Sequence, residues 1–238
     1  NLTNFSAYAD QYCGVGSSLV PPYLKRFHRS SACVMVYTGT QKQMLLSWGL
    51  SNVQVWPPGV DTDLFRATDS AIQAVDTPVF VYLGRLAKEK NIEEFLSLSL
   101  PGTKLVIGDG PERASLEKQY PSCRFVGFKT GKELVDLLST AHVLVFPSRT
   151  DTFGLVIIEA LSCGVPVAAN DVPGRRDIIT NGVDGFLSEN LADAALRCLT
   201  LSRALCRAKA LQFSPAHSAK VFKEFLVPIH APRESLRS

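Results

Sequence analysis

Short apolar runs alternate with longer amphipathic stretches through the middle of the chain. Each run is typical of a strand that is buried on both faces, and the stretches between the runs have helical spacing. The predicted strands are 77–83, 104–107, 123–126, 142–146, 165–169 and 185–187, and the predicted helices include 111–120, one that Thr130 caps, and 154–163. This alternation predicts an α/β fold, a Rossmann-like parallel sheet with helices on both faces. Ligands of such sheets bind at the carboxyl ends of the strands.

The first 70 residues have a different pattern. The predicted elements there are a partly basic helix at 23–29, a strand at 33–37, a helix at 42–48 and a strand at 52–56. They are too few for a complete doubly wound domain, so we interpret them as the remnant of an N-terminal domain. Pro57-Pro58-Gly59 and the polar stretch 66–76 are typical of a connector. The predicted division is a remnant with linker over 1–60, a second domain over 61–213, and a final crossover helix with tail over 214–238.

Composition and charge narrow the range of functions. Hydrophobic residues make up 46% of the chain and charged residues 20%, which provides enough apolar surface for a packed core. The net charge is only +3 and no Lys/Arg run is present, so nucleic acid is not an expected partner. No apolar run reaches the length of a membrane-spanning helix. The six cysteines form no CxxC pair, which favours free thiols in a reducing, cytoplasmic compartment and no bound metal.

Basic residues gather in two places. Lys25, Arg26 and Arg29 lie on the first predicted helix, and Lys and Arg outnumber Asp and Glu after residue 196. Such helices suit a peripheral contact with an anionic inner membrane face. The alternative interpretation is an ordinary solvated basic face.

The stretch from Thr150 to Ala160 carries the main candidate chemistry. It connects a predicted strand to a helix that begins near Gly154 and is apolar almost all round, which predicts a buried helix. The amino end of a helix presents free N–H groups and partial positive charge, and it therefore binds anions. Asp151 lies just outside this end, and Glu159 is a carboxylate within the buried helix. The alternative is an Asp that caps the helix and a Glu in a salt bridge.

A second segment brings cations to the same edge of the predicted sheet. Gly84-Arg85-Leu86-Ala87-Lys88-Glu89-Lys90-Asn91 follows the first strand. Arg85 and Lys90 are therefore expected on the carboxyl side, where Arg as a planar fork and Lys as a point charge neutralise a diphosphate. The alternative is a solvated charge run in which Glu89 pairs locally, and Lys88 is interpreted in that way.

Several spaced motifs together resemble one known family. They are Gly84-Arg85-Leu86 with Glu89-Lys90-Asn91, Gly108-Asp109-Gly110-Pro111, Phe146-Pro147-Ser148, Asp151 to Gly154 with Glu159-Ala160, Gly164 to Val167, and Asn181-Gly182 with Gly185. In this order they resemble the C-terminal domain of retaining GT-B glycosyltransferases, which include sucrose synthase, phosphatidylinositol mannosyltransferases and sulfolipid synthases. The resemblance covers roughly residues 50–225.

The resemblance implies roles for individual residues. The family's pair of acidic residues falls on Asp151 and Glu159, of which Glu159 would hold the nucleotide ribose and Asp151 would face the transferred sugar. Asp151 stands where the family usually has Glu, one methylene longer. The backbone N–H groups of Phe153, Gly154 and Leu155 would contact the sugar hydroxyls and the distal phosphate.

Four further positions are carried over in the same way. Arg85 and Lys90, next to Gly84, match the family's diphosphate-binding pair. Phe128 and Lys129 belong to the segment whose backbone receives the base, and the alternative for Phe128 is core packing. The resemblance implies no metal and no cofactor besides the nucleotide-sugar substrate.

The predicted function is a retaining glycosyltransferase that moves a sugar to a lipid or saccharide acceptor. A UDP-sugar is the favoured donor and GDP-mannose is the alternative. The acceptor site of the family lies in an N-terminal domain that is missing here, so this chain would supply the donor site only. The competing hypothesis is a non-catalytic nucleotide-sugar-binding module, a pseudoenzyme subunit completed by a partner chain. A GT-B epimerase or phosphorylase ranks below both.

Overall fold

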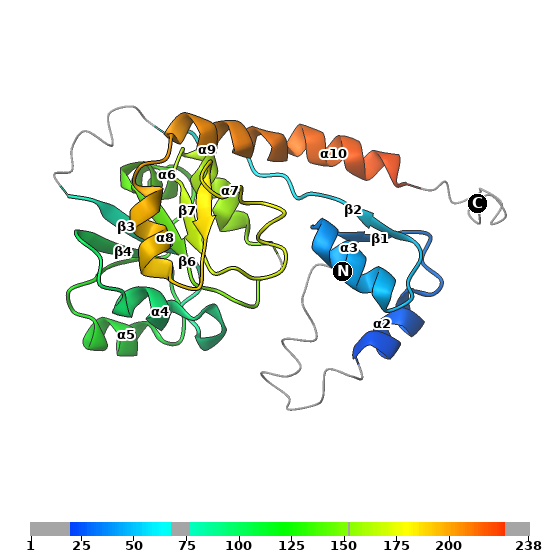
Figure 1. The fold of residues 1–238 in the computed structure, drawn as a ribbon, viewed down its shortest axis with the longest axis horizontal. Helices are drawn as coiled ribbons and strands as arrows, with labels where there is room; N and C mark the ends of the chain where they lie inside the picture. The colour runs from blue at the N-terminus through cyan, green and yellow to red at the C-terminus, as the bar shows by residue number, and fades with distance from the viewer. Residues whose placement is uncertain (1–19, 68–76, 152, 227–238) are drawn as a thin grey trace.

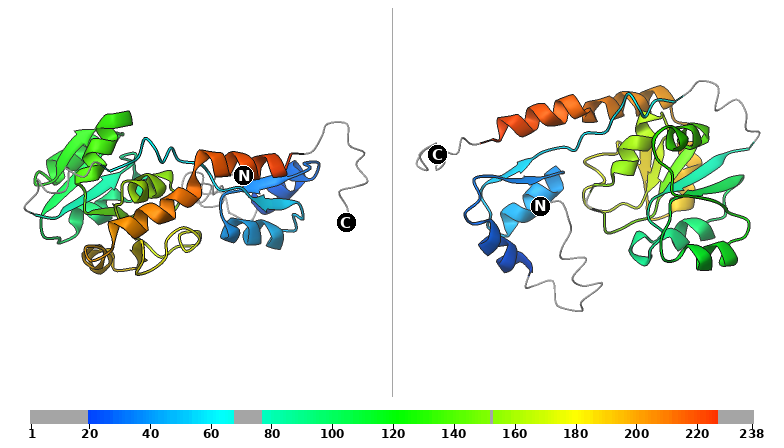
Figure 2. Two further views of the ribbon diagram at one scale, coloured as in Figure 1. Left: turned by 90° about the horizontal axis from the view of Figure 1, so that it is seen from above. Right: turned by 180° about the vertical axis from the view of Figure 1, so that it is seen from behind.

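The computed structural model describes residues 20–67, 77–151 and 153–226 (Figure 1). Most of the predicted connector at 66–76 and the tail after residue 226 lie outside these ranges. The described chain forms a large α/β part, a smaller part near the N-terminus and a helical segment that runs along both (Figures 1 and 2).

Six parallel strands form the larger sheet. They are β3 (Val79–Leu83), β4 (Thr103–Ile107), β5 (Arg124–Gly127), β6 (Val143–Phe146), β7 (Val167–Ala169) and β8 (Gly185–Leu187). Their spatial order is β5-β4-β3-β6-β7-β8, so the chain moves outward from β3 to β5 and then returns to place β6 beside β3. This confirms the predicted parallel α/β sheet. The reversal between β3 and β6 opens a crevice at their carboxyl ends, the usual ligand position in such sheets.

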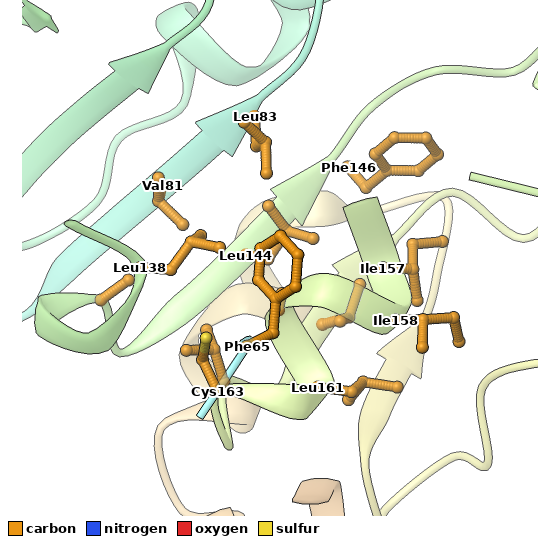
Figure 3. Close-up of a cluster of buried hydrophobic side chains, with 14 of the residues drawn as sticks. Phe65, Val81, Leu83, Leu138, Leu144, Phe146, Ile157, Ile158, Leu161 and Cys163 are labelled. Atoms are coloured by element: carbon orange, nitrogen blue, oxygen red, sulfur yellow. The ribbon is translucent and has the colours of Figure 1, made fainter. Parts of the chain in front are cut away.

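Helices cover both faces of this sheet. On one face lie α6 (Gly131–Thr140), α7 (Leu155–Ser162) and α9 (Arg203–Ala210), and on the other lie α4 (Ile92–Ser97), α5 (Arg113–Gln119) and α8 (Leu191–Cys198). Alternate side chains of β3 pack against the helices on the two faces of the sheet, because successive side chains of a strand point to opposite faces. Val81 packs in the α6/α7 cluster, part of which Figure 3 shows, and Tyr82 packs against α4. All of β3 is buried, as its apolar run predicts.

The first part of the described chain has its own two-stranded parallel sheet. Its elements are α2 (Val20–His28), β1 (Val34–Val36), α3 (Gly39–Ser47) and β2 (Val53–Val55). A small separate core of Val34, Val36, Leu45, Leu50 and Val53 holds them together. Polar and aromatic contacts join this part to the larger one. The N–H of Thr40 donates to Asp177 at 2.9 Å, and the rings of Tyr37 and Phe153 lie 5.6 Å apart.

The final helical segment extends from the larger part to the smaller one. Two 3-10 turns occur among the described residues, η3 (Lys88–Lys90) and η4 (Leu211–Phe213), and η4 leads into α10 (Pro215–Glu224). The indole N–H of Trp56 donates to the carbonyl of Ser218 at 3.1 Å, and its ring lies 5.4 Å from that of Phe222. The packing of Trp56 on α10 therefore joins the end of β2 to the C-terminal helix.

Three local expectations need correction. Thr130 is the N-cap residue of α6, but its side chain makes no capping hydrogen bond. Leu155 in the first turn of α7 is exposed, so this helix is not buried all round. Arg203 and Arg207 do not contribute to a basic outer surface, because their guanidinium groups bind backbone carbonyls.

The cysteines and the helix lengths also bear on the sequence-based predictions. Of the six cysteines, five lie in the described ranges and all five are free thiols. No helix in the described ranges is long and apolar enough to cross a membrane.

Candidate functional site

A cavity of about 430 Å³ opens at the carboxyl ends of β3 and β6. Its volume is in the range typical of small-molecule sites. It lies at the point where the strand order reverses, because β3 and β6 are neighbours with opposite onward directions of the chain. The lining residues are Tyr82, Leu83, Gly84, Arg85, Glu89, Lys90, Phe146, Ser148, Asp151, Gly154, Leu155 and Val156.

Six of the ten predicted site residues line this cavity. Gly84, Arg85 and Lys90 come from the segment after β3, and Asp151, Gly154 and Leu155 come from the segment after β6. The two segments are more than fifty residues apart in sequence, and only the pairing of β3 with β6 brings them together. The remaining four, Phe128, Lys129, Phe153 and Glu159, do not line the cavity.

Lys90 and Asp151 form the central ion pair of the cavity. The Lys90 Nζ lies 2.5 Å from Asp151 Oδ1, and each side chain is 20% exposed. Asp151 is therefore held by Lys90 and does not cap α7, whose N-cap residue is Gly154. This excludes the interpretation of Asp151 as a simple capping residue.

Arg85 reaches the rim of the same cavity. Its side chain is 65% exposed and lies 3.9 Å from the carboxylate of Glu89, which is buried. The Tyr82 hydroxyl donates to the Arg85 carbonyl at 2.8 Å and so fixes the backbone there. Burial, together with the nearby carboxylates of Asp151 and Glu89, raises the pKa of Tyr82, which therefore stays a neutral donor. Lys88 is exposed, as predicted for a solvated cation.

The amino end of α7 faces the cavity with an open turn. Gly154 has φ 82° and ψ 78°, a left-handed conformation that only glycine adopts at low cost. A Cβ at this position would lie 3.1 Å from the Phe146 ring and 3.3 Å from Ile157. Within the described part of the chain, no hydrogen bond engages the N–H groups of Gly154, Leu155 or Val156. These donors are the part of the site that suits an anion.

Glu159 lies on α7 one turn below the cavity. It follows Leu155 by four residues and Val156 by three, so the three side chains share one face of the helix. The Glu159 carboxylate has no hydrogen bond or ion pair with any described residue, which excludes the salt-bridge interpretation. Burial raises the pKa of Glu159, because the charged form is poorly solvated. A hydroxyl-bearing ligand on this face would find an unused acceptor.

Phe128 and Lys129 are placed differently from Phe153. Phe128 is 71% exposed, so the core-packing alternative for it is wrong. The Lys129 ammonium lies 3.2 Å from Glu133 on the first turn of α6. Phe153 is buried between Tyr37 and Phe213, with ring centroids at 5.6 and 5.8 Å, so its ring is not available to a ligand.

Tyr82, Glu89 and Ser148 line the cavity although they were not among the predicted site residues. A further polar residue, Arg175, lies next to the cavity and was not predicted either. Arg175 follows β7 and is completely buried, beneath the segment that connects β6 to α7. Pro173-Gly174-Arg175-Arg176 supplied a weak signal, because it follows a strand at the carboxyl edge. The sequence does not distinguish the two arginines, although Arg176 is exposed and pairs with Asp171 at 2.8 Å.

The chain is similar to known sugar-transferring proteins over most of its length. Residues 66–199 match the model of the family described as glycosyl transferases group 1. A GDP-mannose-dependent alpha-mannosyltransferase of Mycobacterium tuberculosis is 31% identical over 173 residues, which are 69% of this chain and 46% of that protein. A sulfoquinovosyl transferase of Arabidopsis thaliana is 31% identical over 207 residues, 78% of this chain and 40% of that protein. The chain thus spans about half the length of these relatives or less.

Solved structures share the same fold. Sucrose-phosphate synthase from Thermosynechococcus elongatus superposes with a TM-score of 0.77 at 23% identity, covering 92% of this chain and 65% of that one. The Anabaena protein HepE, in complex with UDP, superposes with a TM-score of 0.69 at 20% identity, covering 83% of this chain and 64% of that one. At these identities the likeness concerns the fold.

Proposed function

The chain belongs to the group 1 glycosyl transferases, since the family model matches more than half of it, and from this premise we propose that it forms the donor site of a retaining glycosyltransferase. The donor would be a nucleoside diphosphate sugar, and the acceptor a saccharide or a lipid. The N-terminal domain of the family would supply the acceptor site.

One observation carries this proposal. The cavity unites two cations, Arg85 and Lys90, with the unengaged N–H groups at the amino end of α7. A pyrophosphate carries negative charge on several oxygens, and both kinds of donor bind such oxygens well. Asp151 precedes this turn in the sequence and Glu159 follows it. Their carboxylates would accept hydrogen bonds from the hydroxyl groups of the sugar and of the ribose, respectively. No neutral apolar ligand would use this set of groups.

The proposed mechanism follows from where charge develops. As the bond from the sugar to the diphosphate breaks, negative charge grows on the departing phosphate. Arg85, Lys90 and the first turn of α7 stabilise that charge because they are oriented before the reaction begins. Asp151, held by Lys90 at 2.5 Å, would face the sugar on which positive charge develops. The acceptor would attack from the face that the diphosphate leaves, which retains the anomeric configuration.

Two donors need to be compared. A UDP-sugar is the donor that we favour, and the structural neighbour HepE binds UDP. The Mycobacterium tuberculosis relative is named for GDP-mannose, which keeps that donor as the alternative. The base would lie near Phe128 and Lys129, at the carboxyl end of β5.

Calorimetry with UDP, UDP-glucose and GDP-mannose tests the proposal directly. We expect one of the two nucleotide classes to bind. Lys90→Ala should weaken that binding by about 30-fold, because a charge-assisted hydrogen bond contributes about 2 kcal/mol. Lys88→Ala removes a neighbouring exposed cation of the same type and should leave affinity unchanged. Absence of binding by all three compounds at millimolar concentration would overturn the proposal.

A peripheral contact with an anionic membrane stays a prediction, and both α2 and the exposed Lys220 and Lys223 of α10 keep basic side chains on the surface. Lys25 and Arg26 are exposed on α2, Arg29 is exposed just after its end, and Tyr23 and Phe27 expose aromatic rings beside them. Sedimentation with vesicles that contain anionic lipid, at low salt, is the measurement. If the protein stays in the supernatant, we would abandon the contact, and with it the placement at the inner membrane face of the cytoplasm.

A further inference from the structure

Arg175 is the one fully buried arginine among the described residues. Its guanidinium donates to three backbone carbonyls, those of Asp151 at 3.0 Å, Phe153 at 3.2 Å and Ser148 at 3.4 Å. It also lies over the ring of Phe146, with the guanidinium carbon 4.7 Å from the centroid. No carboxylate makes a hydrogen bond or ion pair with it in the described ranges.

A buried arginine of this kind is costly for folding. Removing a charge from water without an ionic partner costs several kcal/mol, which carbonyl acceptors offset only in part. Burial accordingly lowers the pKa of Arg175 to about 10, although the negative charge of Asp151 acts in the opposite direction. The Nε–H of Arg175 has no hydrogen-bond partner among the residues that the structure describes. A position with this cost points to a role besides stability.

The geometry of the peptide unit suggests what that role is. All peptide bonds in the described ranges are trans, so the C=O of one residue and the N–H of the next point in opposite directions. The carbonyl of Phe153 points at Arg175. The N–H of Gly154 in the same peptide unit must therefore point away from Arg175, and Gly154 lines the cavity whereas Arg175 does not.

We propose that Arg175 is a positioning residue for the donor diphosphate, which fixes the segment between β6 and α7 so that the N–H of Gly154 faces the distal phosphate. The inference rests on the proposed function. The guanidinium also places a positive charge behind the turn, in surroundings that screen it weakly, and this charge favours an anion on the cavity side. The planar guanidinium of Arg175 donates to three carbonyls in fixed directions, a geometry that the ammonium group of a lysine does not reproduce.

The test compares two ligands and three variants. UDP and UMP share base, ribose and proximal phosphate, so their affinity ratio isolates the distal phosphate; GDP and GMP serve in the same way if guanine is the base. Arg175→Met removes both the charge and the fork, and Arg175→Lys keeps the charge alone. Arg203→Met is the matched control, since Arg203 also binds buried carbonyls, those of Ala141 at 2.8 Å and Cys163 at 3.0 Å, but does not line or underlie the cavity.

We expect Arg175→Met to lower the diphosphate-to-monophosphate affinity ratio by about tenfold or more, and Arg175→Lys to lower it less. Arg203→Met should lower the melting temperature without changing the ratio. If Arg175→Met does not fold, Arg175→Lys decides: a reduced ratio supports the proposal and a wild-type ratio overturns it. An unchanged ratio in folded Arg175→Met also overturns it. Failure of the wild-type protein to bind any diphosphate would instead be a failure of the proposed function.

Discussion

The two ends of α7 are built in opposite ways. At the carboxyl end, the carbonyls of the last three helical residues and of the C-cap residue Cys163 each accept a hydrogen bond. The carbonyls of Ala160 and Leu161 accept from the N–H groups of Val165 and Gly164, the pattern of a Schellman motif. The other two, those of Ser162 and Cys163, accept from the guanidinium groups on α9. This end leaves no acceptor free for a ligand.

The amino end leaves its donors free. The N–H groups of Gly154, Leu155 and Val156 have no hydrogen-bond partner in the described ranges, and these residues line the cavity. Here the buried arginine binds the carbonyls of the preceding segment and not the helix itself. The comparison teaches that arginines at both ends fix backbone carbonyls, but only at the amino end does this leave a binding surface. Stability and the proposed ligand binding thus fall on opposite ends of one helix.

The largest effect should come from breaking the carboxyl end. Arg207 donates to the carbonyls of Ser162 at 2.8 Å and Phe65 at 2.6 Å. Arg207→Met leaves both without a donor, so we expect a loss of about 3 kcal/mol in the free energy of unfolding. Urea unfolding measures this loss. Nucleotide affinity of the folded protein should not change, and a fall in affinity equal to that of Lys90→Ala would contradict the division between the two ends.

Two glycines, one at each end of α7, allow the same comparison with a smaller loss of stability. Gly154 and Gly164 both have positive φ, 82° and 70°, and an added Cβ would in each case meet a neighbour at 3.1 Å. Gly154→Ala and Gly164→Ala should each cost about 1 to 2 kcal/mol of stability, because a side chain is strained in this conformation.

The two variants should differ in binding. We expect Gly154→Ala to weaken binding of a nucleoside diphosphate about tenfold, because the turn that presents the N–H groups shifts. Gly164→Ala should bind as the wild-type protein does. Thermal unfolding and calorimetry on both proteins provide the comparison, and equal affinities would argue against a ligand at the amino end.

The smallest effect concerns the charge of Glu159. Burial raises the pKa of Glu159 above its value in the unfolded chain, so the folded protein retains a proton that the unfolded chain has already lost. The free energy of unfolding therefore falls as the pH rises from the pKa of Glu159 in the unfolded chain to its pKa in the folded protein. Above the folded-state pKa the charged carboxylate continues to destabilise the folded protein. Glu159→Gln removes the penalty, so the variant should melt higher than wild type at pH 7.

The same substitution, which should stabilise the protein at pH 7, should weaken nucleotide binding. At pH values below the ordinary pKa of a glutamic acid, both proteins are neutral at this position and the difference in melting temperature should disappear. At pH 7 Glu159→Gln should bind nucleotide more weakly, because an amide is a poorer acceptor for two hydroxyl groups. Melting curves between pH 4 and 7, together with calorimetry at pH 7, check both parts. A more stable variant with unchanged affinity would remove Glu159 from the donor site.

The sequence predicts strands better than side-chain partners. The run 142–146 became the fully buried β6 (Val143–Phe146), and 185–187 became the partly buried β8 (Gly185–Leu187), because a short apolar run bounded by turn residues favours a strand. The family was also predicted correctly from spaced motifs. Thr130, in contrast, has the right position for a cap without the hydrogen bond, since capping depends on a side-chain rotamer that the sequence does not specify.

Arg175 and Phe128 show why part of the candidate site could not be predicted. Arg175 and Arg176 are adjacent and chemically identical, and only the packing of the segment after β7 decides that the first is buried and the second exposed. Phe128 belongs to the type of residue that is most often buried, yet it is exposed at the end of β5. Residue type alone does not determine whether either side chain is buried or exposed.

The sequence by itself determined that the segments after β3 and β6 lie at the same edge of the sheet. Parallel strands joined by helices all end on one side, and the apolar runs define those strands. Only the tertiary structure decided that β6 lies directly beside β3, and so that Lys90 contacts Asp151 across 61 positions of sequence. The physical reason is that strand order follows from how the helices on both faces pack together, a property of the whole core and not of any local stretch.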